Sequence, residues 1–220
     1  MRRLIITAMA AAVMCALSHI PVLAMDWSRA FEKARYSVVS LWHNGGSCTA
    51  FSINYTQNYY LTADHCINED GSMALWKEAV PNFNIKGKID VLQVVKRNGP
   101  LDLALLQGGL GLPALAPGDE PRRGHELASI GYAFGEPEPF IFSSIVAAIK
   151  NAKAYSTTRR IILKDNQDMG GMSGGPVVDK HVNVVAMVQQ ALRVDGHVTN
   201  VAYGTSIRQI REFAKGYWDF

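Results

Sequence analysis

The stretch Gly171-Met172-Ser173-Gly174-Gly175-Pro176, which runs into Val177 and Val178, is the most informative segment of this 220-residue chain. Glycines on both sides of a serine let the backbone turn tightly and point its N–H groups toward one spot. Such a turn suits a nucleophilic serine, because the N–H groups can stabilise the oxyanion that forms when the hydroxyl attacks a carbonyl. A plain turn before a strand is the alternative for this segment taken alone.

Two segments upstream contain the partners that a nucleophilic serine needs. Its hydroxyl requires a base to remove the proton, and the base requires a carboxylate that holds its tautomer and stabilises its charged form. His65 stands in Thr62-Ala63-Asp64-His65-Cys66, and Asp102 stands in the apolar run 101–106. A carboxylate buried among leucines needs a partner, and an imidazolium would be one. The order histidine, aspartate, serine predicts a catalytic triad of His65, Asp102 and Ser173.

In these segments the chain resembles the chymotrypsin-like (trypsin-fold) serine proteases, over residues 36–214. It looks closest to small bacterial or phage members and to HtrA-type protease domains. The resemblance implies an all-β fold of two antiparallel six-stranded β-barrels with a C-terminal helix, and an active site between the barrels. It also implies an endopeptidase that cleaves proteins or peptides through an acyl-enzyme on Ser173. His65 would be the general base and acid, Asp102 would orient it, and Gly171 and Ser173 would form the oxyanion hole.

Two other functions stay open as alternatives. The sequence Gly-x-Ser-x-Gly also forms the nucleophile elbow of α/β-hydrolases, whose triad runs in the order serine, acid, histidine. Downstream candidates for a serine esterase of that kind are Asp179 or Asp195 with His181 or His197. This reading is the weaker one, because the chain after the serine lacks the alternating strands and helices of a parallel sheet. The other alternative is a catalytically silent relative that binds proteins, which the three filled triad positions disfavour.

Short apolar or alternating runs, bounded by glycine, asparagine and proline, predict strands at the spacing of an all-β fold. The predicted strands cover 37–42, 47–53, 59–62, 74–76, 89–95 and 103–106, and then 126–130, 140–148, 160–163, 176–178, 182–189 and 198–204. We therefore expect a first barrel over 36–111, a linker over 112–124 and a second barrel over 125–205. Helices are expected over Asp26–Ala34, with Asp26 as N-cap, and over 206–216.

The amino-terminal segment predicts export. A basic start at residues 1–3, an apolar run over 4–17 and the segment Val22-Leu23-Ala24, which ends in a small residue, are typical of a secretory signal peptide. We expect cleavage after Ala24, which leaves a protease domain over 25–220 in a secreted or periplasmic protein. An uncleaved membrane anchor is disfavoured, because polar residues and a proline interrupt a run that is already short for a span. No integral membrane segment is expected after the signal is removed.

Removal of the signal peptide takes away Cys15 and leaves the pair Cys48 and Cys66. A remaining pair in an exported protein favours a disulfide over two unpaired thiols. The two positions match the family's bridge between the strand before the histidine and the histidine loop. Closing a loop of this size stabilises a protein by about 3 kcal/mol in the chain-entropy model.

The nearly balanced charge of the chain gives no reason to expect nucleic acid as a partner. The chain has 22 Lys and Arg against 19 Asp and Glu, and loss of Arg2 and Arg3 leaves 20 against 19, a net charge of +1. No basic stripe interleaved with aromatic residues accompanies that balance. We also expect neither a metal ion nor a cofactor.

Two positions next to the predicted triad depart from the family. Animal trypsin-like enzymes carry an aspartate before the serine, which binds the new amino terminus after zymogen cleavage; here Met172 stands there. We therefore expect the oxyanion loop to be ordered by packing or by a partner. Asp64 stands where the family commonly has alanine, and the sequence assigns it no role.

The predicted substrate pocket carries no clear charge signature. Gln167 lies six residues before the serine, where trypsin-type enzymes have the aspartate that pairs with Lys or Arg, and Asp168 follows it. The pocket-lining strand matches residues 185–190, with Val188 where glutamate-specific relatives have histidine, and Gln189 after it. We expect a neutral P1 side chain, with Asp168 as the reason to consider a basic one.

Overall fold

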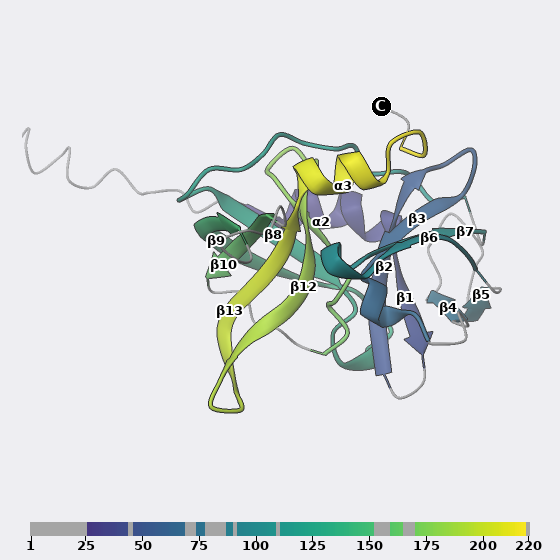
Figure 1. The fold of residues 1–220 in the computed structure, drawn as a ribbon. Helices are drawn as coiled ribbons and strands as arrows, with labels where there is room; N and C mark the ends of the chain where they lie inside the picture. Colours follow the sequence, from purple (N-terminus) through teal and green to yellow (C-terminus); the bar gives the residue numbers. More distant parts are fainter. Residues whose placement is uncertain are drawn as a thin grey trace, which may run out of the picture.

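The computed structural model describes residues 26–43, 46–68, 74–77, 87–89, 92–108, 111–151, 159–164 and 170–218. These residues fold mainly as antiparallel strands in two sheets that lie side by side (Figure 1). The predicted signal peptide and the pocket residues Gln167 and Asp168 lie outside the described residues.

The first half of the chain forms a seven-stranded sheet in the order β5-β4-β1-β2-β3-β7-β6. Its strands are β1 Val38–His43, β2 Gly46–Asn54, β3 Tyr59–Thr62, β4 Ala74–Lys77, β5 Gly87–Ile89, β6 Gln93–Asn98 and β7 Leu103–Gln107. Strand β2 lies at the centre and is buried from Cys48 to Asn54, because both of its neighbours pair with it and its apolar residues face the core.

This sheet corrects two predictions. A closed six-stranded first barrel is not confirmed, because no ladder joins β5 to β6 in the described part of the sheet. The single strand predicted over 89–95 is wrong, since β5 and β6 pair with different partners at opposite edges of the sheet. Only three residues separate Ile89 from Gln93, a reach of at most about 14 Å, so the sheet curls until its edges come near each other.

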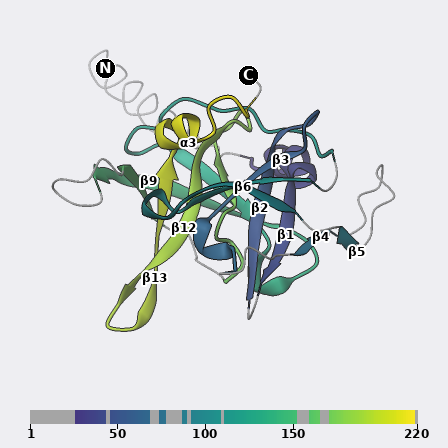
Figure 2. The ribbon, with the colours of Figure 1, turned by 45° about the vertical axis from the view of Figure 1, so that its right-hand side comes forward.

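The second half forms the predicted closed antiparallel barrel, in the order β10-β13-β12-β11-β8-β9. Its strands are β8 Glu126–Gly131, β9 Phe140–Asn151, β10 Arg159–Lys164, β11 Pro176–Val178, β12 Val184–Val194 and β13 His197–Ser206. Strands β12 and β13 extend beyond the barrel as a long hairpin, which projects from the body of the molecule in Figures 1 and 2. Its turn is Asp195-Gly196, a sequence that favours tight hairpins.

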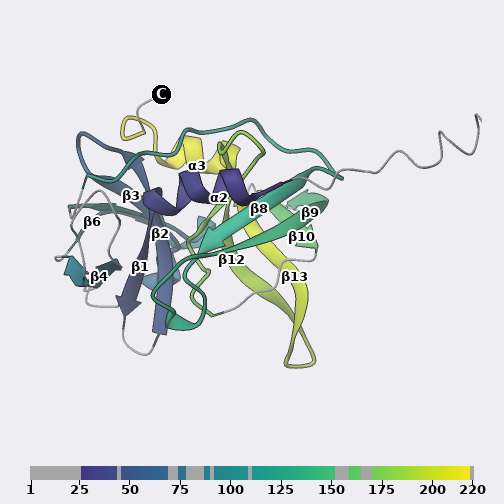
Figure 3. The ribbon, with the colours of Figure 1, turned by 180° about the vertical axis from the view of Figure 1, so that it is seen from behind.

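In the described part of the chain, two short α-helices flank the sheets. Helix α2, Ser28–Ala34, starts later than predicted, although the Asp26 carboxylate still accepts a hydrogen bond from the Ser28 N–H at 2.9 Å. Hydrogen bonding with the Ser28 side chain, followed by this main-chain bond, lowers the pKa of Asp26. Helix α3, Ile207–Phe213, confirms the C-terminal helix, and Ile207, Ile210 and Phe213 form its buried stripe. Figure 3 shows α2 from behind, where it crosses the upper end of β1 and β2 and runs toward β8.

The segment predicted as a linker, 112–124, packs closely on both halves. Leu112 and Leu115 are buried in the larger core cluster, and the Ser52 hydroxyl donates to the Leu112 carbonyl at 2.9 Å. The Gly118 N–H donates to the Val184 carbonyl in β12 at 2.7 Å. Because the same core cluster contains residues of both sheets, the two halves are held in a fixed relation, which a site shared between them requires.

Candidate active site

The three predicted triad residues lie on connections rather than in strands. His65 lies in the 3-10 helix η2, Asp64–Cys66, which follows β3. Asp102 follows the 3-10 helix η3, Gly99–Leu101, immediately before β7. Ser173 lies in the turn before β11. Each of the three residues thus lies close in sequence to a strand, which limits how far its short segment can move: β3 for His65, β7 for Asp102 and β11 for Ser173.

His65 and Asp102 are in direct contact. His65 Nδ1 lies 2.9 Å from Oδ2 and 3.0 Å from Oδ1 of Asp102. The main-chain N–H of His65 also donates to Asp102 Oδ1 at 3.0 Å. The imidazole is 48% exposed, whereas the carboxylate is 21% exposed. The carboxylate thus holds both the ring and the backbone of His65, while the rest of the ring faces solvent.

Local hydrogen bonds fix the backbone of Asp102 in a left-handed conformation, with φ 54° and ψ 51°. The Leu101 N–H donates to the Asn98 side chain at 3.0 Å, and the Asp102 N–H donates to the Gly99 carbonyl at 3.0 Å. Aspartate tolerates this region better than most residues with a Cβ atom. The turn therefore aims the carboxylate at η2.

Asp64, which the sequence left without a role, forms an ion pair with Arg97 of β6. Arg97 Nε lies 2.6 Å from Asp64 Oδ1, and Nη2 donates to Oδ2 and to the main-chain carbonyl, both at 3.3 Å. The Asp64 carboxylate raises the pKa of Arg97. This pair ties the helix that carries His65 to the strand that leads to Asp102. Sequence reasoning missed Arg97, since no local pattern links it to Asp64.

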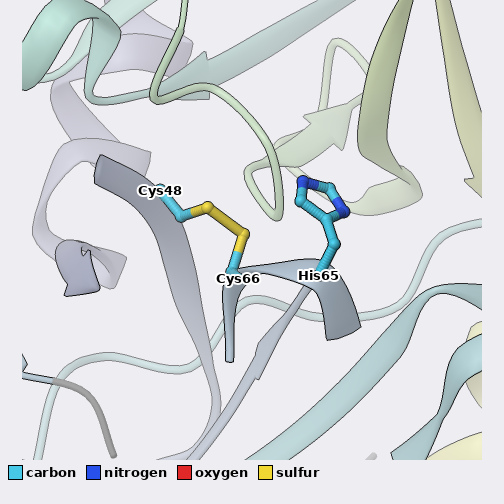
Figure 4. A group of neighbouring side chains, drawn as sticks. All are labelled: Cys48, His65 and Cys66. Atoms are coloured by element: carbon cyan, nitrogen blue, oxygen red, sulfur yellow. A yellow bond between two sulfur atoms is a disulfide. The ribbon is translucent and has the colours of Figure 1, made fainter. Parts of the chain in front are cut away.

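Cys48 and Cys66 form the predicted disulfide, which joins β2 to η2 directly beside His65 (Figure 4). Potential metal-ligating atoms of these cysteines and of His65 all lie within 4.8 Å of one another. The two sulfur atoms are bonded to each other, so neither cysteine offers a thiolate ligand. In the disulfide-bonded protein this group of three residues is therefore not a metal site. The disulfide instead limits the movement of the segment that contains His65.

The Ser173 turn packs between β2 and β12. The main-chain carbonyl of Ser173 accepts a hydrogen bond from the Thr49 N–H at 2.8 Å and lies 3.8 Å from Cys66 Sγ, next to His65. The Ser173 hydroxyl donates to the Gln189 carbonyl at 2.9 Å. A hydroxyl has one proton to donate, so in this geometry the proton is directed to β12 and not to an imidazole.

Glycine is required at two positions of this turn. Gly171 has φ +105°, and a Cβ there would lie 2.0 Å from the Tyr132 carbonyl oxygen; Gly174 has φ +82°, and a Cβ there would lie 2.3 Å from the Thr49 carbonyl oxygen. Within the described residues, no group accepts a hydrogen bond from the N–H of Gly171 or of Ser173. An oxyanion hole needs main-chain N–H groups that are available beside the nucleophilic hydroxyl, and these two N–H groups match that requirement.

Thr49 holds this turn, although the sequence did not point to it. The Thr49 hydroxyl donates to the Gly171 carbonyl at 2.7 Å and accepts a hydrogen bond from the Tyr132 N–H at 2.9 Å. Its position directly after Cys48 was the available signal. Met172, which stands where the resembling enzymes have an aspartate, is 1% exposed and belongs to the core cluster of the second barrel.

Val188 and Gln189 lie in β12 behind the Ser173 turn, and both are buried. The Val188 carbonyl accepts from the Gly174 N–H at 2.8 Å. The Gln189 side chain donates to the Leu101 carbonyl at 3.0 Å, and the Thr205 hydroxyl donates to the same carbonyl at 3.0 Å. Gln189 thus connects the serine turn to the residue before Asp102, and a role for it and Val188 in a substrate pocket stays a prediction.

Among the described helices, none has the length and apolar character needed to cross a membrane.

The two sheets, and the order of histidine, aspartate and serine on the connections between their strands, match the trypsin-like class of peptidase domains. The family model for the trypsin-like peptidase domain matches residues 46–187, well over half of the chain. The chain therefore belongs to the trypsin-like peptidase family. No curated protein sequence matches it.

Solved structures of bacterial proteases share its fold. The HtrA-type protease AlgW with a bound tripeptide superposes with a TM-score of 0.71 at 22% identity, over 85% of this chain and 62% of that one. The serine endoprotease of Yersinia pestis gives 0.69 at 17% identity, over 86% and 65%. The active form of the Rv3671c protease of M. tuberculosis gives 0.69 at 15% identity, over 84% and 82%. The chain spans less than two thirds of the first two proteins.

Proposed function

We propose that this chain is an exported serine endopeptidase that hydrolyses peptide bonds through an acyl-enzyme on Ser173. His65 acts as general base and then as general acid, and Asp102 orients it. The observation that carries the proposal is the contact of His65 Nδ1 with both carboxylate oxygens of Asp102, at 2.9 and 3.0 Å. This contact keeps a proton on Nδ1 and leaves Nε2 as the basic atom.

The reaction follows from these roles. His65 Nε2 takes the proton of the Ser173 hydroxyl as Oγ attacks the substrate carbonyl, so the hydroxyl must leave its hydrogen bond to the Gln189 carbonyl. The imidazolium, stabilised by Asp102, then gives this proton to the leaving amine, and the acyl group stays on Oγ. Water, activated by His65, finally hydrolyses the acyl-enzyme.

The oxyanion of both tetrahedral intermediates would bind the N–H groups of Gly171 and Ser173. Their lack of acceptors among the described residues supports this role. Removal of one such donor raises the barrier by about 3–4 kcal/mol in comparable sites. The buried Met172 supports a loop that packing holds ready, without a zymogen switch.

Peptides or proteins are the proposed substrates. HtrA-type AlgW, which shares the fold, has been solved with a tripeptide and with a decapeptide. A neutral P1 side chain is proposed, because Gln167 and Val188 occupy the positions that decide charge specificity in the resembling family, with Asp168 as the residue that would favour a basic one.

Export to the periplasm or the medium is part of the proposal. The Cys48–Cys66 disulfide supports it, because such bonds persist in oxidising compartments. Residues 1–24 would be removed as the signal peptide. The mature domain would then cover 25–220, with the curled first sheet in the place of the first barrel.

A fluorophosphonate probe and the Ser173→Ala variant test the proposal together. The wild-type protein should label at one serine, located at Ser173 by peptide mapping, and should cleave casein. Ser173→Ala should lose labelling and at least several orders of magnitude of activity while keeping its circular dichroism spectrum, since the triad acts as a unit; His65→Ala should be about as damaging. A wild-type protein that neither labels nor cleaves would favour the silent binding protein. Equal casein cleavage by Ser173→Ala, with contaminants excluded, would refute the triad.

A further inference from the structure

Trp42 and Phe134, which we call the aromatic rim, expose large apolar surfaces next to the candidate active site. Phe134, in the 3-10 helix η4 (Ala133–Gly135), is 70% exposed, and Trp42, near the end of β1, is 44% exposed. A Cβ at Gly135 would lie 3.2 Å from Cη2 of Trp42, so the indole rests on the neighbour of Phe134. Figures 1 and 3 place the β8–β9 connection beside the ends of β1 and β2. Contiguous exposed aromatic groups mark binding surfaces.

The backbone of Phe134 is a second observation that points to a ligand. Its φ of 56° and ψ of 18° lie in the left-handed region, which glycine and asparagine adopt at lower cost. Packing does not explain an aromatic residue there, because most of the ring faces solvent. A strained backbone that presents an exposed aromatic ring is typical of a ligand contact.

A main-chain hydrogen bond connects the aromatic rim to the predicted oxyanion loop. The Phe134 N–H donates to the Gly170 carbonyl, one residue before Gly171. Ser47 Oγ would lie 3.0 Å from a Cβ at Gly171 and 3.8 Å from a Cβ at Gly135, so Ser47 lies between the two. An extended peptide covers about 3.3 Å per residue. A substrate bound at Ser173 therefore reaches the aromatic rim within a few residues.

The side of the scissile bond follows from His65. In the proposed mechanism His65 gives its proton to the leaving amine, which must lie beside it. A short path of contacts leads from His65 to Trp42. Cys66, the residue after His65, forms the disulfide with Cys48. Ser47, the residue before Cys48, pairs with Trp42 in the β1–β2 ladder. The leaving group thus points toward the aromatic rim, whereas β12 lies on the other side of the Ser173 hydroxyl.

We propose that the aromatic rim binds an apolar side chain in the first two substrate residues after the scissile bond. This inference rests on the proposed protease function and adds a substrate class to it: peptides with aliphatic or aromatic residues directly after the cleaved bond.

Internally quenched peptides test this preference. All share one acyl half, taken from the best-cleaved sequence of a peptide library, and carry Leu, Phe, Ser or Asp at the two positions after the bond. A p-nitrophenyl ester of the same acyl half has no residues there and provides the reference rate. Each kcat/KM for a peptide is divided by the kcat/KM for the ester. On this scale, the wild-type protein should cleave the Leu and Phe peptides about tenfold faster than the Ser and Asp peptides.

Variants assign the preference to the aromatic rim. Phe134→Asn, which suits the left-handed backbone, and Trp42→Ser should each reduce the preference to about twofold or less, whereas Phe134→Tyr should keep it. Val194→Ser removes an exposed apolar side chain from the β12–β13 hairpin and should change neither preference nor ester rate. Thermal melts verify that each variant is folded.

Two results overturn the inference, and each has a distinct meaning. Equal cleavage of all peptides by the wild-type protein, or a preference that survives in both Phe134→Asn and Trp42→Ser, refutes the aromatic rim while the protease function stands. Failure of the wild-type protein to hydrolyse the ester and to label at Ser173 refutes the proposed function itself.

Discussion

At the scale of single residues, the Asp102 carboxylate makes three contacts that an amide cannot reproduce. Oδ1 accepts from the His65 main-chain N–H and lies 3.0 Å from Nδ1, while Oδ2 lies 2.9 Å from Nδ1. An asparagine whose oxygen served the main-chain N–H would turn its NH₂ group toward Nδ1. The imidazole would then carry its proton on Nε2, the atom that must accept the proton of Ser173.

Asp102→Asn should therefore lower kcat by about 10⁴-fold near neutral pH, as expected for a wrong histidine tautomer, and leave the fold intact. Steady-state kinetics on a peptide substrate and circular dichroism check the two parts of this expectation. A kcat within tenfold of the wild-type value would show that Asp102 does not orient His65.

A second prediction at the scale of single residues concerns the ion pair between Arg97 and Asp64. The hydrogen bond to Asp64 raises the pKa of Arg97 and so favours the charged guanidinium that the ion pair requires. Exposed ion pairs stabilise a fold by about 0–1 kcal/mol, and we expect a similarly small change in stability from Arg97→Gln. Its effect on kcat should be larger, a loss of about three- to tenfold, because the pair holds η2 against β6.

The double variant Asp64→Asn with Arg97→Gln is the matched control. If the two side chains act only as a pair, the double variant should be no slower than the worse single variant, which is the result expected of coupled positions. Additive losses in kcat would mean that each residue acts independently, and unchanged kinetics in both single variants would remove any role in positioning His65.

At the scale of elements, the Cys48–Cys66 disulfide joins β2 to η2 across a sequence separation of 18 residues. The chain-entropy model gives about 3 kcal/mol for a loop of this length. In a protein of this size each kcal/mol changes the melting temperature by about 2–4 °C. The bridge also limits the movement of His65, the residue next to Cys66.

Replacing both cysteines with alanine should thus lower the melting temperature by about 6–12 °C, and kcat should fall because η2 loses one of its attachments. Differential scanning calorimetry and kinetics below the new melting temperature measure the two effects separately. Non-reducing peptide mapping of the exported wild-type protein is the control. Free thiols at both positions would contradict the bridge.

At the scale of the whole molecule, helix α2 packs into the larger core cluster, and in the described residues no hydrogen bond or ion pair joins it to His65, Asp102 or Ser173. Figures 1 and 3 show α2 at the back of the molecule as seen in Figure 1, and its buried residues Ala30 and Ala34 join the larger core cluster. Met172, in the oxyanion loop, is buried among apolar side chains and has no charge with which to bind a free amino terminus.

A protein that starts at Met25 and one with extra residues before it should therefore have similar kcat and KM. In a zymogen of the trypsin kind, the extended form would be nearly inactive until trimmed. Kinetics on both forms, with intact mass to verify that the extension survives the assay, make the comparison. Activity that appears only as the extension is lost would mean that some carboxylate replaces the missing aspartate, with Asp168 as the first residue to test.

The sequence by itself determined the features that depend on short segments. The nucleophile turn, the histidine segment, the cysteine pair and most strand positions follow from residue type and local spacing, because a turn needs its glycines and a strand needs alternation. The buried stripe of α3 follows from the same kind of pattern, whereas the closed second barrel was expected only from the resemblance to the trypsin-like family.

The tertiary structure alone decided which distant side chains meet. Arg97 pairs with Asp64 across 33 positions, Gln189 binds the Leu101 carbonyl across 88, and Thr49 holds Gly171 across 122. The order of the seven-stranded sheet, which assigns β5 and β6 to opposite edges, is a fact of the same kind. Local periodicity reports which face of a strand is apolar, but it does not report which partner that strand or side chain contacts. Those partners are chosen by the packing of the whole chain.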